Sequence, residues 1–388
     1  MVAVTEKTLN PDDIRTALAG VKDPEIRRPI TELGMVDRVE VLPGGVVDLT
    51  VLLTIAGCPL RETLTNDVTA AVRAVPGVSE VRLTLGVMTD EQRTQLRENL
   101  RGGATREIPF AQPSSRTRVY AIASGKGGVG KSTVTVNLAA ALAAKGLSVG
   151  VLDADIYGFS IPRMLGVTGN PTRVDDMILP PVARWEGSPA EVKVISVGMF
   201  VEGNTPVVWR GPMLHRALQQ FLADVFWGDL DVLLLDLPPG TGDVAISVGQ
   251  LIPSTEILVV TTPQQAAAEV AERAGAIALQ TRQKVAGVVE NMSGMTLPDG
   301  TVLDVFGSGG GEQVANSLTQ LTGHEVPLLA QVPLDPALRV AGDTGRPLVL
   351  RPEAADSPAA QALNTVAGNL AARTKPLAGV SLGISPRR

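Results

Sequence analysis

From residue 119 onward, short apolar runs alternate along the chain with stretches of helical spacing. The runs lie at residues 119–124, 148–152, 192–197, 232–237, 257–261 and 285–289. Strands that alternate with helices are typical of a parallel, doubly wound sheet with right-handed crossovers. We therefore expect an α/β fold, with ligands bound beyond the carboxyl ends of the strands.

The first 90 residues follow another pattern. Asn followed by Pro favours a helix start at Asn10, and Gly and Pro between two apolar runs favour a hairpin. These signals predict a short helix after Asn10, hairpin strands at 36–42 and 46–53, a helix at 61–74 and a strand at 78–83. A polar helix is expected to begin at residues 89–92. We interpret this part as a small α+β domain.

A change of composition separates the two patterns. Residues 102–118 are rich in Gly, Pro, Ser, Thr and Arg, as linkers are. We therefore expect a small α+β domain at 1–100, a linker at 101–117, a doubly wound, mainly parallel α/β domain at 118–375 and a loose tail at 376–388.

Composition narrows the function classes. Apolar residues make up 44% of the 388 and aromatic residues 3%, so the core must consist of aliphatic side chains, as parallel sheets favour. The net charge of −6 without a basic run argues against a nucleic-acid partner. No apolar stretch approaches 18 residues, which argues against a membrane partner. The single cysteine fits a reducing compartment, and we expect a cytoplasmic protein.

The strongest motif is a phosphate-binding loop. Residues 125–132 read GKGGVGKS and match G-x-x-x-x-G-K-[ST] between a predicted strand and an Ala-rich helix. Glycines let backbone N–H groups approach phosphate oxygens, and the helix N-terminus adds positive charge. We expect Lys131 to bridge the β- and γ-phosphates of ATP, Ser132 to bind Mg²⁺ and Thr133 to reach the α-phosphate. The predicted nucleotide contacts are Gly125, Lys126, Gly127, Gly128, Val129, Gly130, Lys131, Ser132 and Thr133.

Acidic residues end two further predicted strands. Asp236 follows three leucines, and we expect it to hold Mg²⁺ through water. The loop PPGTGD follows at 238–243, where the N–H of Gly240 is expected to sense the γ-phosphate. Asp155, in the segment LDAD at 152–155, is the candidate for positioning the attacking water, with a helix cap as the alternative. Asp153 is the weaker candidate.

Taken together, these motifs resemble the Mrp/Nbp35 family of P-loop ATPases, also called ApbC. The likeness is carried by DADIYG at 153–158, DLPPGTGD at 236–243, ENMS at 290–293 and FG at 306–307, and it covers nearly the whole chain. The first domain is similar to the MIP18-type module, through DPEI at 23–26, LGMV at 33–36 and CP at 58–59.

The resemblance implies several properties. Members form homodimers that hydrolyse ATP and carry iron–sulfur clusters to apo-proteins. Lys126, an early lysine in the loop, is expected to cross the dimer interface to the partner's nucleotide, so that Lys126, Lys131, Asp155 and Asp236 form the catalytic set. Asn291 is expected to bond the purine base, with a turn-forming role as the alternative. Clients or assembly factors are the implied partners, and gating of cluster transfer is an alternative to direct carriage.

The sequence departs from the family at the cluster site. The family's [4Fe–4S] cluster is held by a C-x-x-C pair from each subunit, because four thiolates complete its ligation. The segment 294–305, where the pair belongs, has no cysteine. Cys58 is the remaining thiol, and it is interpreted either as a transient contact for a cluster or partner or as a small core residue. His215 and His324 show no metal-ligand spacing.

Two other functions share some of these motifs. A positioning ATPase of the ParA/MinD type would switch its dimerisation with ATP, but the tail lacks an amphipathic basic helix and the charge argues against a DNA-binding face. An ATP-dependent metabolic enzyme would need a second-substrate motif, and none is recognised.

Overall fold

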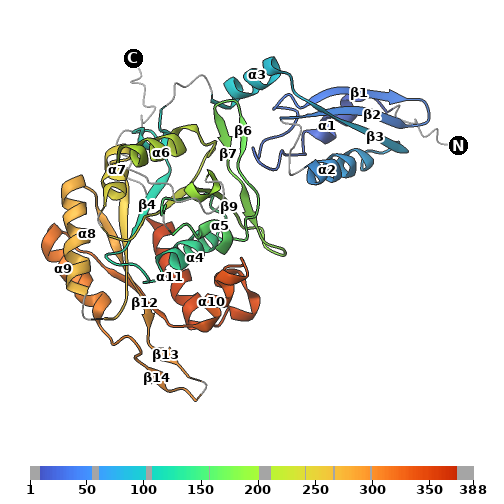
Figure 1. The fold of residues 1–388 in the computed structure, drawn as a ribbon. Helices are drawn as coiled ribbons and strands as arrows, with labels where there is room; N and C mark the ends of the chain where they lie inside the picture. Colours follow the sequence, from blue (N-terminus) through green and yellow to red (C-terminus); the bar gives the residue numbers. More distant parts are fainter. Residues whose placement is uncertain are drawn as a thin grey trace, which may run out of the picture. The chain divides into compact units, whose positions relative to one another are not determined.

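The computed structural model describes residues 9–54, 61–101, 107–156, 158–200, 211–240, 242–264, 267–297 and 299–373. Contacts divide the chain into two compact units (Figure 1). The first unit comprises residues up to Arg106 together with Pro171–Pro180. The second comprises Glu107–Asn170 and residues from Pro181 onward.

The first unit is a three-stranded sheet with helices. Its elements are α1 (Pro11–Leu18), β1 (Val36–Leu42), β2 (Val46–Leu53), α2 (Arg61–Arg73), β3 (Glu80–Val87), α3 (Asp90–Arg101), β6 (Thr172–Val174) and β7 (Met177–Leu179). β1 and β2 form the predicted antiparallel hairpin, whereas β3 pairs with β2 in parallel after the α2 crossover. The Asn10 side chain accepts the N–H groups of Asp12 and Asp13, which confirms the predicted helix start.

The hairpin β6–β7 belongs to this unit although it lies far along the sequence. The Thr172 hydroxyl donates to Oε1 of Glu25 over 2.8 Å, and both side chains are buried. Val174 and Met177 are buried as well. A segment surrounded in sequence by the second unit therefore completes the packing of the first.

The second unit contains an eight-stranded sheet in the order β15-β12-β11-β4-β10-β5-β9-β8. The strands are β4 (Arg118–Ala123), β5 (Val149–Asp153), β8 (Val182–Arg184), β9 (Glu191–Ser196), β10 (Val232–Asp236), β11 (Glu256–Thr261), β12 (Val285–Ser293) and β15 (Leu328–Pro333). Only the edge strand β8 pairs antiparallel within the described part of the sheet. This confirms the predicted doubly wound, mainly parallel sheet.

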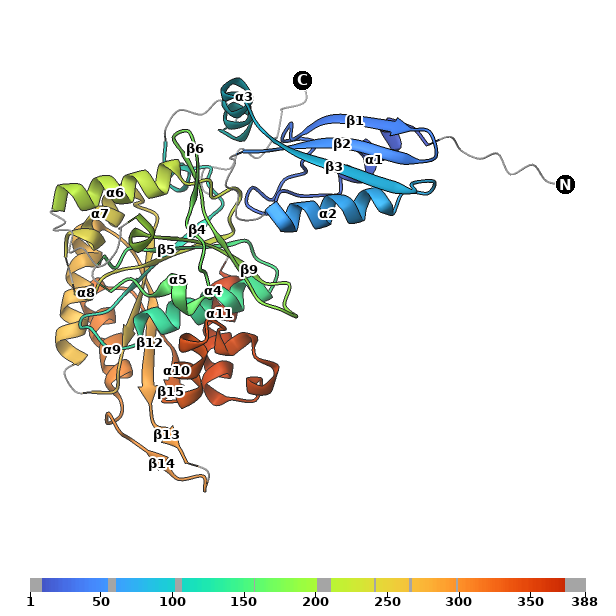
Figure 2. The same ribbon diagram turned by 45° about the vertical axis from the view of Figure 1, so that its right-hand side comes forward.

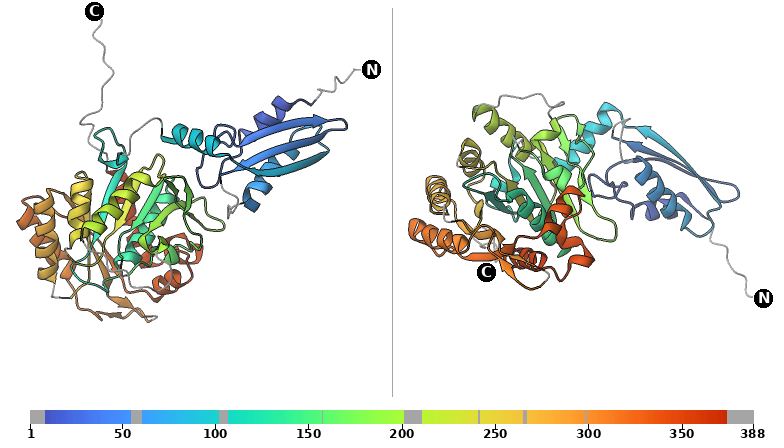
Figure 3. Two further views of the ribbon diagram at one scale, coloured as in Figure 1. Left: turned by 45° about the horizontal axis from the view of Figure 1, so that its top comes forward. Right: turned by 60° about the horizontal axis from the view of Figure 1, so that its bottom comes forward.

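Helices cover both faces of this sheet, as Figures 1 and 2 show. One face packs against α4 (Lys131–Ala144) and α11 (Pro358–Ala372), with α5 (Ile161–Met164) and α10 (Pro336–Asp343) nearby. The other packs against α7 (Asp243–Leu251), α8 (Ala267–Thr281) and α9 (Gly310–Thr322), and α6 (Gly211–Asp224) packs on α7. α8 and α9, the yellow-orange and orange helices, also lie side by side in both views of Figure 3. Short 3-10 turns lie at Pro109–Ala111, Val197–Phe200, Leu348–Leu350 and Pro352–Ala354.

The core confirms the expectation of aliphatic packing. Alternate side chains of the central strands, such as Leu234 and Val151, lie fully buried against Leu138 and Leu142 of α4. α4 is apolar nearly all round, because the sheet covers one side and α11 the other. Within the described ranges, no helix is both long and apolar enough to cross a bilayer.

A small hairpin extends from the second unit where the family's cysteine pair is expected. It consists of β13 (Met295–Thr296) and β14 (Val302–Leu303), and Figure 1 shows it pointing away from the sheet. Val302 and Leu303 are exposed. No strand was predicted in this segment, because each strand has only two residues.

Candidate functional site

The phosphate-binding loop joins β4 to α4 as predicted. Gly128 and Gly130 have φ values of 79° and 80°, in the left-handed region that favours glycine. A Cβ on Gly130 would lie 2.2 Å from Nδ2 of Asn291, which nothing but glycine tolerates. Gly127 and Gly128 are exposed, so their backbone faces solvent at the N-terminus of α4. This is the arrangement that binds phosphate groups.

Lys131 and Ser132 converge on Asp236. The Lys131 Nζ lies 2.7 Å from Oδ2 of Asp236, and the Ser132 hydroxyl donates to the same oxygen over 2.6 Å. Thr135 donates to Oδ1 over 2.7 Å, a contact that the sequence motif did not indicate. Lys131 is 6% exposed and Asp236 is fully buried. The loop and the end of β10 therefore form one charged, hydrogen-bonded centre.

Sheet register explains why these groups meet. β10 lies between β4 and β5, and Asp236 pairs with Ile122 on one side and Asp153 on the other. The three strands thus end at one level, where the phosphate-binding loop begins. Ligand sites at this edge are a general property of doubly wound sheets.

Asp155 lies at the same edge, in the segment after β5. Its Oδ2 is 4.0 Å from Lys131 Nζ, and its Oδ1 accepts the N–H of Gly158 over 3.0 Å. The next helix, α5, begins at Ile161, so Asp155 stabilises a turn before that helix. Its role in positioning water stays a prediction, and the structure places the carboxylate beside Lys131.

Asp153 is the residue whose environment the sequence least revealed. Its side chain is fully buried, and burial, together with the charge of Asp236, raises its pKa from 3.8 to about 7. Hydrogen bonds from the N–H groups of Asp155 and Ile161 and from the Ser196 hydroxyl partly oppose this rise. Asp153 thus holds both ends of the segment that carries Asp155.

The donor set fits a magnesium ion. The carboxylates of Asp155 and Asp236 lie 4.0 Å and 2.7 Å from the ammonium of Lys131, and the Ser132 hydroxyl contacts the same Asp236 oxygen. Hydroxyl and carboxylate oxygens are the ligands that Mg²⁺ prefers. Ser132 and Asp236 are therefore suitable residues to hold it.

Gly240 and Asn291 bind the loop region itself. The Gly240 N–H donates to the Ser124 carbonyl over 2.8 Å, and the Asn291 amide donates to the Val129 carbonyl over 2.9 Å. Asn291 is buried. It lies within β12, which continues to Ser293, whereas the apolar run predicted a strand that ends at residue 289. Contacts of Gly240 with the γ-phosphate and of Asn291 with the base stay predictions. Thr133 is half-buried in the first turn of α4.

Lys126 contacts Gln264, which the sequence analysis did not single out. The Lys126 Nζ donates to Oε1 of Gln264, in the segment after β11. A lone glutamine after a strand carries no motif signal. The lysine therefore has a partner within its own chain.

The thiol and histidine predictions concern other parts of the chain. Cys58 lies outside the described residues. His215 is half-buried on α6, and His324 is exposed after α9. Within the described ranges, no group of three or more His, Cys, Asp or Glu side chains is arranged to hold a metal ion.

Comparison with known proteins agrees with this geometry. The family model described as NUBPL iron-transfer P-loop NTPase matches residues 115–371. The chain belongs to this iron-transfer P-loop NTPase family. A second model, described as iron-sulfur cluster assembly protein, matches residues 11–83. The family assignment and the assembly-type first domain confirm what the motifs indicated.

Relatives of this NTPase match it along nearly its whole length. Proteins named iron-sulfur cluster carrier protein from Mycobacterium tuberculosis and Mycobacterium leprae are 67% and 64% identical over 377 and 376 residues. These matches cover 97% of this chain and 97% and 96% of the relatives. A solved nucleotide-binding protein from Archaeoglobus fulgidus, in complex with ADP, is 32% identical with a TM-score of 0.51, covering 69% of this chain and 96% of that chain.

Proposed function

We propose that this chain is an ATP-hydrolysing, dimeric switch that binds iron–sulfur clusters and transfers them to apo-proteins, or gates that transfer. The observation that carries the proposal is the convergence of Lys131 and Ser132 on Asp236 at the phosphate-binding loop. The family, the carrier proteins that match along the whole chain and the ADP complex of the archaeal relative support it.

Binding of ATP would exchange one partner of Lys131. The ammonium is held by the Asp236 carboxylate, and a triphosphate offers several anionic oxygens in its place. Loop N–H groups at the start of α4 would bind the same phosphates. Mg²⁺, held by Ser132 and through water by Asp236, would neutralise charge on the phosphates. Lys131 and the metal site are thus prepared by one existing contact network.

Hydrolysis would depend on positioning more than on covalent chemistry. Asp155, 4.0 Å from Lys131, would orient the water that attacks the γ-phosphate. Lys126 would supply a further positive charge to the nucleotide of the partner subunit. Closure of two subunits over ATP and their release after hydrolysis would then form the switch.

The cluster is the cargo of this switch. The segment 294–305 contains no cysteine, and the described residues offer no three-ligand group of their own. We therefore infer that ligands from a client or a small thiol complete the site, with Cys58 as the candidate contact of this chain. This version of the carrier function places fewer thiolates on the carrier itself.

Two measurements test the proposed function. Calorimetry with Mg-ATP should detect binding by wild type and none by Lys131→Ala; equal binding would refute the nucleotide site. Anaerobic reconstitution with iron, sulfide and glutathione should load wild type more than Cys58→Ala, judged by iron content and absorbance. If the two proteins bind equally little iron, direct carriage is wrong and the gating version remains.

A further inference from the structure

Lys126 is held within its own subunit by a single described side chain, Gln264. The contact joins Lys126 Nζ to Oε1 of Gln264, and both side chains are half-buried. Gln264 follows β11, which pairs in parallel with β4, the strand that leads into the phosphate-binding loop. The sheet therefore brings the two residues to the same edge.

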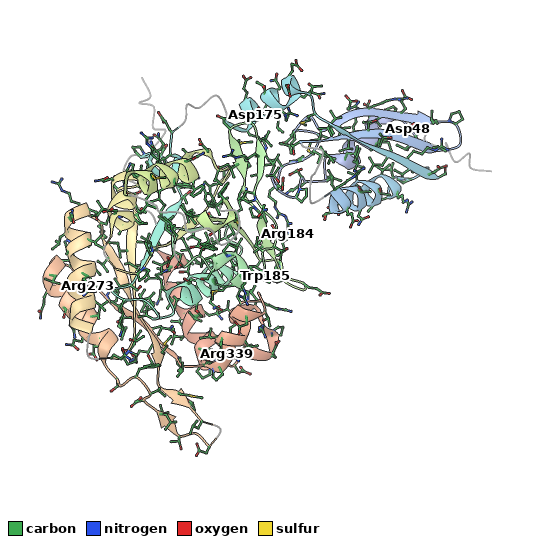
Figure 4. All side chains as sticks on the ribbon, viewed as in Figure 1. Asp48, Asp175, Arg184, Trp185, Arg273 and Arg339 are labelled. Carbon is green, nitrogen blue, oxygen red and sulfur yellow. The ribbon has the colours of Figure 1, made fainter. Side chains whose placement is uncertain are left out.

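The backbone before Lys126 is fixed against α8. A Cβ on Gly125 would lie 2.7 Å from Cα of Val270, so only glycine fits this approach. Arg273, marked on α8 in Figure 4, donates from Nη1 to the Gly125 carbonyl over 3.1 Å. Since the loop backbone is held at this point, any movement of the Lys126 ammonium has to come from rotation of its side chain.

The two lysines of the loop have partners of different strength. Lys131 is 6% exposed and pairs with the Asp236 carboxylate at 2.7 Å, whereas Lys126 pairs with a neutral amide oxygen. An ammonium is bound more strongly by a charged acceptor than by a neutral one. A triphosphate can therefore displace Gln264 from Lys126 more readily than it could displace a carboxylate side chain at position 264.

We propose that Gln264 is a positioning residue that holds Lys126 in its own subunit until a second copy presents a nucleotide. The inference rests on the proposed function, in which Lys126 acts on the partner's triphosphate. The Lys126–Gln264 hydrogen bond must break before that contact forms, so it opposes the hydrolysis-competent dimer. Its strength sets the fraction of subunits whose Lys126 is available.

The test is steady-state phosphate release by the full chain with Mg-ATP at one protein concentration. Gln264→Ala removes the acceptor and is expected to raise turnover by about tenfold or more, the effect of one hydrogen bond to a charged group. Gln264→Glu supplies a charged acceptor and is expected to lower turnover by a similar factor. In a Lys126→Ala background, Gln264→Ala is expected to leave the rate of phosphate release unchanged.

Two controls separate this role from a structural one. Gln313→Ala, on the exposed face of α9, should match wild type. Calorimetric affinity for Mg-ADP should be unchanged in both Gln264 variants, because Lys131 and Ser132 bind that nucleotide. Loss of affinity in either variant would show that Gln264 supports the loop and would overturn the proposal.

The outcomes distinguish the two levels of inference. If Lys126→Ala turns over as fast as wild type, the shared-lysine step of the proposed function is wrong. If Lys126→Ala is slow but Gln264→Ala fails to accelerate hydrolysis, or acts equally with and without Lys126, the positioning role of Gln264 is wrong while the shared lysine stands.

Discussion

Replacing the buried carboxyl of Asp153 by an amide should change how stability depends on pH. The native pKa is raised from 3.8 to about 7, chiefly by burial and then by Asp236. Between these values the native state keeps a proton that the unfolded chain has lost, so the free energy of unfolding falls as pH rises through this window. Above pH 7 the accumulated penalty is about 4 kcal/mol.

Asp153→Asn removes this penalty but also one acceptor oxygen. With the amide nitrogen in the place of Oδ1, the hydrogen bond from the Asp155 N–H is lost at a cost of about 1 kcal/mol, while the remaining oxygen still accepts from Ile161 and Ser196. The variant should therefore be more stable than wild type by about 3 kcal/mol at pH 8 and by less than about 1 kcal/mol at pH 5. Other titrating groups are common to both proteins and cancel in the difference.

Urea denaturation followed by tryptophan fluorescence suits this measurement. The tryptophans within the described residues, Trp185 and Trp227, belong to the second unit, so their signal reports the unit that contains Asp153. The experiments are done without nucleotide and with EDTA, so that bound nucleotide or metal ions do not contribute to the pH dependence of stability. Parallel stability curves for the two proteins between pH 5 and pH 8 would refute the raised pKa and its physical cause.

Three further substitutions test the nucleotide site. Lys131→Ala should abolish ATP binding in calorimetry, because the variant lacks the ammonium that would leave Asp236 to bind the phosphates. ATP binding as strong as that of wild type would contradict this. Asp155→Ala should retain ATP and accumulate a dimer, seen as an earlier peak in gel filtration with Mg-ATP; a monomer peak would speak against the switch. Gly130→Ala should weaken ATP binding by about tenfold or more, because the new Cβ meets Asn291 and φ is +80°; fluorescence titration with a labelled nucleotide measures the loss, and unchanged affinity would count against the strained loop.

The sequence allowed the second unit's sheet and the phosphate-binding loop to be predicted closely. Apolar runs of strand length marked β4, β5 and β10, and the glycine spacing marked the start of α4. β12 extends to Ser293, beyond its apolar run. Glu290 and Asn291 are polar, but they lie buried in the strand because their side chains form hydrogen bonds there. Side chains of this kind look like loop residues in a sequence.

The remaining differences arise from contacts between distant segments. Asp153 ranked below Asp155, because its burial and the nearby Asp236 become visible only once β5 and β10 lie together. Gln264 went unnoticed, since a single glutamine has no motif around it. The antiparallel edge strand β8 was not predicted either, as its three residues give too short a pattern.

The hairpin β6–β7 has a consequence for work with fragments of this protein. A truncation that begins at residue 107 would keep Thr172, Val174 and Met177 but remove Glu25 and the rest of the first unit. The hydroxyl of Thr172 would lose its acceptor, and the two apolar side chains would face water. Exposed strands of this sort promote self-association. An isolated fragment of the P-loop NTPase unit is therefore expected to aggregate unless residues 171–180 are replaced by a short polar turn.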